Sequence, residues 1–329
     1  MNPSTEKKRI LSGMRSTGAK LHIGNYEGAL RNWVGLQDKY RMFCMVADWH
    51  ALTTQFNDTS EISRNSREVA KDFVAGGIDP ECSPLFIQSH IKEHAELHVL
   101  FSMVTPLGWL ERVPTFKEKQ QDVGGAERVP YGLLGYPVLQ AADILMYKPY
   151  GVPVGKDQAP HLEVSREIGR RFNNLYGDVF PEFVNIIGDI PVLPGLDMRK
   201  MSKTYDNCIY INESPDETAK KIKSAFTTPT KIKKTDPGIP EGCAVCQYLK
   251  LYSPNWEQQW DEYRQGVRGC MMNKNECVEA VNEFLRPMRE RRAQLDDSTI
   301  EDILRQGAAE ARLVAQQTMQ DVREAMQLW

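Results

Sequence analysis

The chain has 329 residues, of which 26% are charged and 41% hydrophobic, a composition typical of a globular protein. A formal net charge of −3 excludes a surface covered in basic groups, although a local basic stripe could still bind nucleic acid. No stretch approaches the roughly 18 consecutive apolar residues of a membrane span, and no signal-peptide core follows the polar segment Met1–Arg9. We therefore expect a cytoplasmic protein without membrane segments, large enough for two domains.

The first two hundred residues alternate short apolar runs with helix-period segments. The runs Arg9–Ser12, Met42–Ala47 and Leu85–Ser89 predict buried strands. Between them, Gly24–Tyr40 and Glu61–Val74 carry apolar residues at helical spacing and predict helices. The alternation predicts an α/β fold with a parallel sheet covered by helices on both faces, and ligands at the carboxyl ends of the strands.

The first motif follows the first predicted strand and opens the first predicted helix. It consists of Ser12–Arg15 and Thr17–Tyr26, and its glycines allow a planar ligand to approach the backbone. Within it, His22 and Asn25 could donate hydrogen bonds to phosphate oxygens. A plain strand-to-helix turn would explain the same pattern, so the motif alone decides little.

The second motif is an apolar helix with a polar face, Tyr136–Tyr147, followed by the run Val152–Gln158. Tyr136, Gln140 and Asp143 are spaced i, i+4 and i+7, so they share one side of the helix. A lone buried aspartate usually caps a neighbouring element, but three converging polar groups indicate a ligand. A carboxylate in an apolar slot suits an indole N–H, and such a site rejects analogues that lack this donor.

The third motif, Arg199–Thr204, follows a turn-rich segment. Two lysines flank a small hydroxyl residue there, which suits a mobile clamp on a leaving pyrophosphate. By itself the pattern is also typical of a solvated surface loop. From about Pro215 the β-rich runs stop and charged amphipathic helices follow; the last helix has a stripe of small residues that includes Ala308, Ala311 and Ala315.

Taken together, these motifs resemble the tryptophanyl-tRNA synthetases. Thr17–Tyr26 is similar to the His-Ile-Gly-His signature of class I aminoacyl-tRNA synthetases, with Asn25 replacing the final histidine. Arg199–Thr204 is similar to their Lys-Met-Ser-Lys-Ser loop, and Thr204 keeps the hydroxyl of the last serine. Tyr136–Gln158 and the run after His161 are similar to the tryptophan enzymes in particular, and the resemblance covers nearly the whole chain.

The resemblance implies a fold, an activity and partners. It implies a class I Rossmann-type catalytic domain with a helical insertion over residues 1–206 and a helical anticodon-binding domain over residues 207–329. The expected reaction is ATP-dependent activation of L-tryptophan to tryptophanyl-adenylate, with Mg²⁺, and transfer to tRNA(Trp) by a homodimer. The alternatives are a tyrosyl-tRNA synthetase, which places similar residues on this helix, or an inactive paralogue that binds tRNA.

The family's roles transfer to matching positions of this chain. Asp143 would accept the indole N–H, and the other residues expected around the amino acid are Tyr136, Gln140, His50, Gln158, Ile144, Val152, Val154 and Gly13. Those expected at ATP are Arg15, Gly24, Asn25, Lys119, Gly155, Asp157, Gln158, Met201 and Ser202. The residues expected to carry the chemistry are His22, Asn25, Lys200 and Lys203. Ala19 looks like an insertion into the first motif, and Gln140 replaces a methionine of many bacterial members.

Four cysteines of the helical half form a possible metal site. Cys243 and Cys246 make a Cys-x-x-Cys pair, and Cys270 and Cys277 follow. Such a set fits a [4Fe–4S] cluster or a tetrahedral zinc ion, although separate surface and buried thiols are the alternative. Iron–sulfur-containing bacterial members of the family resemble this region at three positions, but their fourth cysteine aligns with Ala280. The prediction is that Cys246 replaces it.

Overall fold

A computed structural model of the chain describes residues 7–113, 116, 129–155, 159–188, 193–226, 231, 233 and 235–328. Within these residues a five-stranded sheet has the order β3-β2-β1-β4-β5, and every neighbouring pair is parallel. Its strands are β1 (Arg9–Arg15), β2 (Arg41–Ala47), β3 (Leu85–Ile87), β4 (Gly151–Val154) and β5 (Val184–Ile187). The predicted α/β class with a parallel sheet is confirmed, and the three predicted strands are β1, β2 and β3.

The sheet separates two hydrophobic cores because successive side chains of a strand point to opposite faces. In β2, Met42 and Val46 belong to one core, whereas Phe43 and Met45 belong to the other. This explains why β2 is an uninterrupted apolar run, since both of its faces are covered by helices. The strand order reverses between β1 and β4, which is where ligands bind in such sheets.

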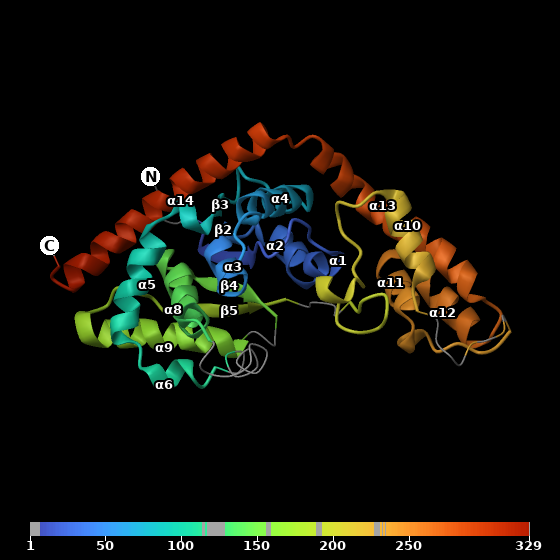
Figure 1. Cartoon of the computed structure of the whole chain (residues 1–329), viewed down its shortest axis with the longest axis horizontal. Helices are drawn as coiled ribbons and strands as arrows, with labels where there is room; N and C mark the ends of the chain where they lie inside the picture. Colours follow the sequence, from blue (N-terminus) through green and yellow to red (C-terminus); the bar gives the residue numbers. More distant parts are fainter. Residues whose placement is uncertain are drawn as a thin grey trace.

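Helices surround the sheet (Figure 1). In the described part of the first two hundred residues they are α1 (Ile23–Asn25), the π-helix η1 (Tyr26–Leu30), α2 (Arg31–Leu36), α3 (Asp48–Gln55), α4 (Ile62–Ala75), the 3-10 helix η2 (Gln88–His90), α5 (Glu93–Val104), α6 (Leu107–Leu110), α8 (Tyr131–Met146) and α9 (Ala159–Tyr176). None of the described helices has the length and apolar character needed to cross a membrane.

The two helix predictions near the N-terminus differ in how closely they match the observed bounds. The segment predicted over residues 61–74 is α4, which begins and ends one residue later. The segment predicted over residues 24–40 ends at Leu36 and contains the π-helix η1. That π-helix carries the buried Glu27, whose carboxylate accepts hydrogen bonds from Arg31 at 2.8 Å and from Tyr252 at 3.1 Å. Apolar spacing cannot indicate such a tertiary contact, so the sequence predicted an ordinary helix.

The second half of the chain is helical from Pro215 onwards, as predicted. Its helices are α10 (Pro215–Ser224), the 3-10 helix η6 (Pro240–Gly242), α11 (Ala244–Tyr252), α12 (Trp256–Arg264), α13 (Cys270–Ala293) and α14 (Asp297–Ala325); a further 3-10 turn, η5 (Lys203–Tyr205), precedes them. Figure 1 shows α10 to α13 grouped beside the sheet, while α14 turns back across it. The region expected to form the helical domain therefore includes one helix that packs on the sheet half.

Helix α14 covers β3, which is an edge strand of the sheet. Its stripe of small residues allows close packing: a Cβ at Gly307 would lie 2.1 Å from the carbonyl oxygen of Leu85. Ion pairs hold the helix further along, between Lys148 and Asp321 and between Arg323 and Glu96. An uncovered edge strand offers unpaired backbone groups to other chains, so this helix also protects the sheet.

Replacing Gly307 by alanine should destabilise the protein by about 1–3 kcal/mol, because the new methyl group must push α14 away from the β3 backbone. Urea unfolding monitored by circular dichroism measures the change. Gly35→Ala is the matched control: this helical glycine has open space around its α-carbon, so stability should stay equal or rise slightly. Equal stability of Gly307→Ala and wild type would show that the close packing has no energetic consequence.

Candidate active site

A cavity of about 1010 Å³ lies at the carboxyl ends of β1 and β4, where the strand order reverses. A volume of this order holds a nucleotide together with a second small molecule. Around it lie sixteen of the predicted site residues: Gly13, Arg15, His22, Asn25, His50, Tyr136, Gln140, Asp143, Ile144, Val152, Val154, Gly155, Lys200, Met201, Ser202 and Lys203. Lys119, Asp157 and Gln158 lie outside the described residues. Gly24 does not line the cavity.

The first motif forms the turn from β1 into α1. His22 accepts a hydrogen bond from the Asn25 backbone N–H through its ring Nδ1 at 3.1 Å, and the Asn25 side chain accepts from the His22 backbone N–H at 3.2 Å. Burial and the nearby positive charge of Lys203 lower the pKa of His22 to about 4. The ring is therefore uncharged near neutral pH, and because its Nδ1 accepts, its Nε2 carries a hydrogen that can be donated.

The two predicted nucleotide motifs meet in space. A Cβ at Gly24 would lie 3.0 Å from the sulfur of Met201, and a Cβ at Gly18 would lie 2.7 Å from the Lys203 ammonium nitrogen. A side chain at either position would contact the third motif, and the flexible ends of Met201 and Lys203 would have to shift to admit it. Burial lowers the pKa of Lys203. Its ammonium group thus lies beside the first motif, where a bound anion would stabilise its positive charge.

The loop of the third motif is shaped by Asn207, a residue that sequence reasoning missed. Its side-chain oxygen accepts from the Ser202 backbone N–H at 2.8 Å, and its amide donates to Asp197 at 2.7 Å and to the carbonyl of Lys200 at 3.1 Å. A Cβ at Gly195 would lie 2.2 Å from the Asn207 amide nitrogen. Asn207 follows the motif by only a few residues, but an asparagine in a loop gives no signal of its own.

Asp143 is the most completely bonded group of the cavity. Its carboxylate accepts hydrogen bonds from His50 at 2.8 Å, from the Gln88 amide at 2.8 Å and from His94. Burial by itself would raise the pKa of Asp143, but the hydrogen bonds from His50 and His94 outweigh it and lower the pKa to about 2. Behind His94, the hydroxyl of Tyr147 lies 2.8 Å from the second ring nitrogen. The carboxylate is therefore ionised and held rigidly.

Three of these partners were not predicted. Gln88 follows the last residue of β3, in a position that the sequence assigned to a strand. His94 lies in α5, a helix for which no motif was recognised, and Tyr147 is the residue that directly follows α8. All three are fully buried. Because strand ends of a parallel sheet meet at one edge, the polar Gln88 after an apolar run was the one signal available.

The wall beside Asp143 is apolar. Ile144 and Val152 are nearly fully buried, and Val154 is half-buried at the end of β4. Gln140 lies one turn and Tyr136 two turns before Asp143 on α8, and both also face the cavity. The arrangement combines an apolar slot with a single ionised acceptor and two neutral polar groups, as the spacing on this helix predicted.

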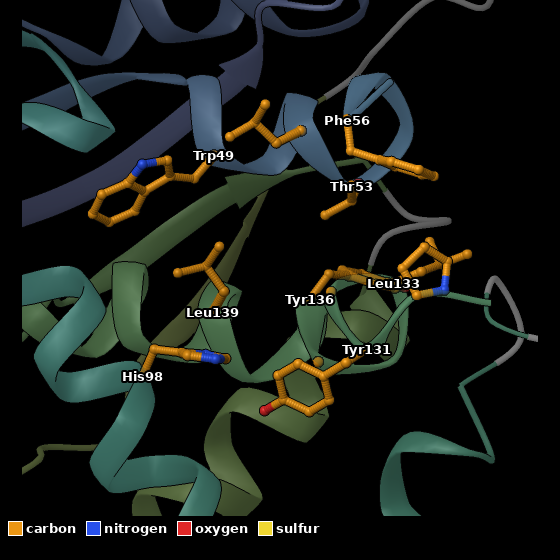
Figure 2. A pocket seen from close by; sticks show the side chains of 12 residues that line it. Trp49, Thr53, Phe56, His98, Tyr131, Leu133, Tyr136 and Leu139 are labelled. Atoms are coloured by element: carbon orange, nitrogen blue, oxygen red, sulfur yellow. The ribbon is translucent and has the colours of Figure 1, made fainter. Parts of the chain in front are cut away.

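A second, smaller cavity of about 220 Å³ adjoins the first. Figure 2 shows Trp49 of α3 and Phe56, which follows α3, facing Tyr136 and Tyr131 of α8 across it, with His98 of α5 at one side. Tyr136 contributes to the lining of both cavities and therefore stands between them. Nothing in the sequence pattern indicated this apolar cavity.

The four predicted metal-binding cysteines come from two helices that pack together. Cys243 precedes α11, Cys246 lies in its first turn, and Cys270 and Cys277 lie on α13. A hydrogen bond donated by Cys246 lowers the pKa of Cys243, and the same contact raises the pKa of Cys246. Asn273 approaches the Cys246 sulfur at 3.5 Å. However, in the described part of the chain no three histidine, cysteine or acidic side chains stand close enough to hold a metal ion.

Comparisons with known proteins identify the family. The model of the tRNA synthetases class I (W and Y) family matches residues 3–288. A tryptophan–tRNA ligase of Thermotoga maritima is 46% identical over 326 residues, covering 97% of this chain and 99% of the relative. One of Aquifex aeolicus is 41% identical over 394 aligned positions, covering 97% of this chain and 100% of the relative.

Solved structures agree with the sequence relatives. The crystal structure of tryptophanyl-tRNA synthetase from Campylobacter jejuni complexed with ADP and tryptophan has a TM-score of 0.87 at 36% identity, covering 97% of this chain and 99% of the other. A tyrosyl-tRNA synthetase of Archaeoglobus fulgidus has a TM-score of 0.66 at 19% identity, which shows a shared fold alone. The tyrosyl alternative is therefore not supported, and the chain belongs to the class I tRNA synthetases and, within them, to the tryptophan–tRNA ligases.

Proposed function

We propose that the large cavity binds L-tryptophan and ATP side by side, with the indole N–H on Asp143. The observation that carries this assignment is the ionised, buried Asp143 carboxylate in an apolar slot, within the same cavity as both nucleotide motifs. The tryptophan carboxylate attacks the α-phosphate of ATP and pyrophosphate leaves. A ribose hydroxyl of tRNA(Trp) then attacks the acyl carbon of the adenylate, and AMP leaves. No covalent enzyme intermediate is required, so catalysis consists of positioning and charge stabilisation.

The hydrogen bonds of Asp143 indicate how tryptophan is selected. Because the carboxylate already accepts from three side chains, an indole N–H has to share or displace one of these donors. His50 is the one whose side chain lines the cavity, whereas Gln88 and His94 are fully buried behind the acceptor. We assign His50 to release Asp143 when the indole enters and then to contact the amino acid. An analogue without the N–H would leave the rearranged acceptor unpaired, which disfavours its binding.

The nucleotide end of the cavity is assigned to the two signature motifs. An uncharged His22 donates from Nε2 to a phosphate oxygen, and Asn25 holds the orientation of its ring. Lys200 and Lys203 stabilise the leaving pyrophosphate. Mg²⁺ enters with ATP, since it binds phosphate oxygens and water more readily than a cage of protein ligands. The roles of Lys119, Asp157 and Gln158 stay predictions, because these residues lie outside the described part of the chain.

Two partners are also assigned. Lys220 and Lys223 of α10 are exposed and are candidates for contacts with tRNA phosphates, whereas Lys221 is paired with Glu213 at 2.6 Å.

A second copy of this chain is assigned to the apolar side of α5, where Met103 is 73% exposed and Val99 is 49% exposed. A cytoplasmic location stays a prediction from the sequence.

A thiolate-held group is assigned to the four cysteines of α11 and α13. The set of four thiols fits a [4Fe–4S] cluster or zinc in its chemistry, because cysteine thiolates are the usual ligands of both. The sulfur atoms are not gathered around a common centre, so binding would have to draw them closer together. When bound, the group would supply structural cohesion between α11 and α13, away from the proposed activation site.

The first test is substitution of the indole acceptor. Asp143→Ala should lower kcat/KM for tryptophan by a factor on the order of 10²–10⁴ in pyrophosphate exchange, because neither the N–H acceptor nor the charge that orders its partners remains. Gln140→Met is the matched control on the same helix face and should retain most of the activity. Folding is checked by near-ultraviolet circular dichroism. A folded Asp143→Ala enzyme with wild-type kinetics for tryptophan would contradict the assignment.

The second test concerns the charge of His22. With a pKa of about 4, only roughly a tenth of this ring should be protonated at pH 5, compared with nearly all of an exposed histidine. Between pH 6.5 and 4 this ring is protonated in the unfolded chain but not in the folded chain. The group therefore lowers the free energy of unfolding as the pH falls through this range. Histidine NMR titration, with His22→Asn to assign the signal, checks the value. A midpoint near 6.5 would contradict the buried, uncharged donor.

The third test concerns the cysteines. Anaerobically purified protein should be brown, absorb near roughly 400 nm and contain iron, and Cys246→Ser should lose that iron. Tryptophan activation should survive in this variant, while tRNA charging falls. Cys82→Ser, which changes an exposed cysteine elsewhere, is the control and should keep its iron. Finding one zinc per chain would support the site and change the identity of its metal. A metal-free wild-type protein with full activity would contradict the proposed site.

A further inference from the structure

Helix α4 lies between the first signature motif and the helical half of the chain. Its residues contact the loop that leads from β1 to α1, and its opposite side packs against α13 and the start of α14 (Figure 1). None of its residues was singled out from the sequence, and none lines the large cavity. Its polar contacts nevertheless join two parts of the fold: Ser66 and Asp72 bond the segment around the first motif, and Glu68, Lys71 and Asp72 bond α13 and α14.

Two side chains of α4 hold the two ends of the first motif's loop. The Ser66 hydroxyl donates to the Ser16 hydroxyl at 3.0 Å, and both groups are buried. The carboxylate of Asp72 accepts from the backbone N–H of Leu21 at 2.9 Å. Ala19, the residue that looks inserted, lies between these two points. The insertion is thus confined to the middle of the loop, and the backbone entering His22 is fixed directly by Asp72.

Asp72 is fully buried and depends on a charge from another part of the fold. Arg292, near the end of α13, donates from Nε to its second oxygen at 2.7 Å and from Nη2 to Glu68 at 2.5 Å. Nearby, Lys71 pairs with Asp297 at 2.6 Å. The end of α13 is therefore fastened to the helix that holds the His22 loop.

We propose that Asp72 and Arg292 are positioning residues for ATP: Arg292 keeps the Asp72 carboxylate ionised, and that carboxylate orders the backbone that presents His22. The inference rests on the proposed assignment of His22 to ATP. It makes the docking of α13 a requirement for nucleotide binding, although α13 contributes nothing to the lining of the cavity. Neither residue touches the substrates, so both act through the loop.

The charges around Asp72 give the arrangement a pH dependence. Burial raises the pKa of Asp72 to about 6; Arg292 and the Leu21 N–H oppose this rise, and Glu68 adds to it. Lys203 of the third motif also feels the Asp72 charge. Removing Arg292 should therefore raise the pKa of Asp72 further. The stabilising charge on the loop is lost as the pH falls through that value, so the loss should begin at a higher pH in the variant.

The test compares Asp72→Asn, Arg292→Gln and Arg292→Lys with Arg291→Gln as the matched control. Arg291 is the neighbouring residue of α13 and bonds α4 only at the carbonyl of Ala75, away from the loop. Asp72→Asn keeps the shape and should raise the KM for ATP on the order of tenfold, with the KM for tryptophan unchanged. In Arg292→Gln the acidic limb of kcat/KM for ATP should move to higher pH, Arg292→Lys should partly restore it, and Arg291→Gln should leave both readouts unchanged.

The outcomes separate this inference from the site assignment. If His22→Ala raises the KM for ATP while Asp72→Asn and Arg292→Gln change only the free energy of unfolding, the pair is purely structural and the inference is wrong. If His22→Ala leaves the KM for ATP unchanged, the proposed nucleotide site itself fails. A raised KM for ATP in all three variants, with the shifted pH limb in Arg292→Gln, supports both.

Discussion

The proposed active site is organised around one electrostatic constraint, the burial of the ionised carboxylate of Asp143. Removing such a group from water costs several kcal/mol unless nearly all of its lone pairs are occupied. The donors come from three different elements: Gln88 from η2, directly after β3, His50 from α3 and His94 from α5. Together they keep the charge paired before the amino acid binds, and only His50, which lines the cavity, is assigned to give way to the indole N–H. The side of the slot formed by Gln88 and His94 is consequently preformed.

Much of the architecture was predictable because local and global signals agree. The apolar run at β2 is buried on both faces, and Tyr136, Gln140 and Asp143 share one side of α8 through helical spacing alone. The glycines at positions 18 and 24 lie where the third motif approaches the first. These features depend on periodicity or on short motifs, which a single sequence displays directly.

Other residues that shape the site act through tertiary contacts between distant segments, and no local sequence pattern marks them. His94 and Tyr147 become meaningful only when α5 and α8 are packed together, and Asn207 only when its loop is folded. The pairing of Arg292 with Asp72 joins residues that are 220 positions apart. The domain boundary expected after residue 206 likewise did not include the return of α14 to β3. The small-residue stripe of α14 is compatible with any closely packed neighbour, so the sequence does not say which element it contacts.

The long separation between β3 and α14 has a consequence for synthesis. β3 ends at Ile87 and α14 begins at Asp297, so roughly 200 residues are added between the strand and the helix that covers it. At about 5–20 residues per second, the edge of β3 stays open for roughly 10–40 seconds on the ribosome. During this interval neighbouring nascent chains on one messenger could pair through that edge. Slow elongation of this gene, or crowding of polysomes, should therefore increase aggregation even when the finished protein is stable.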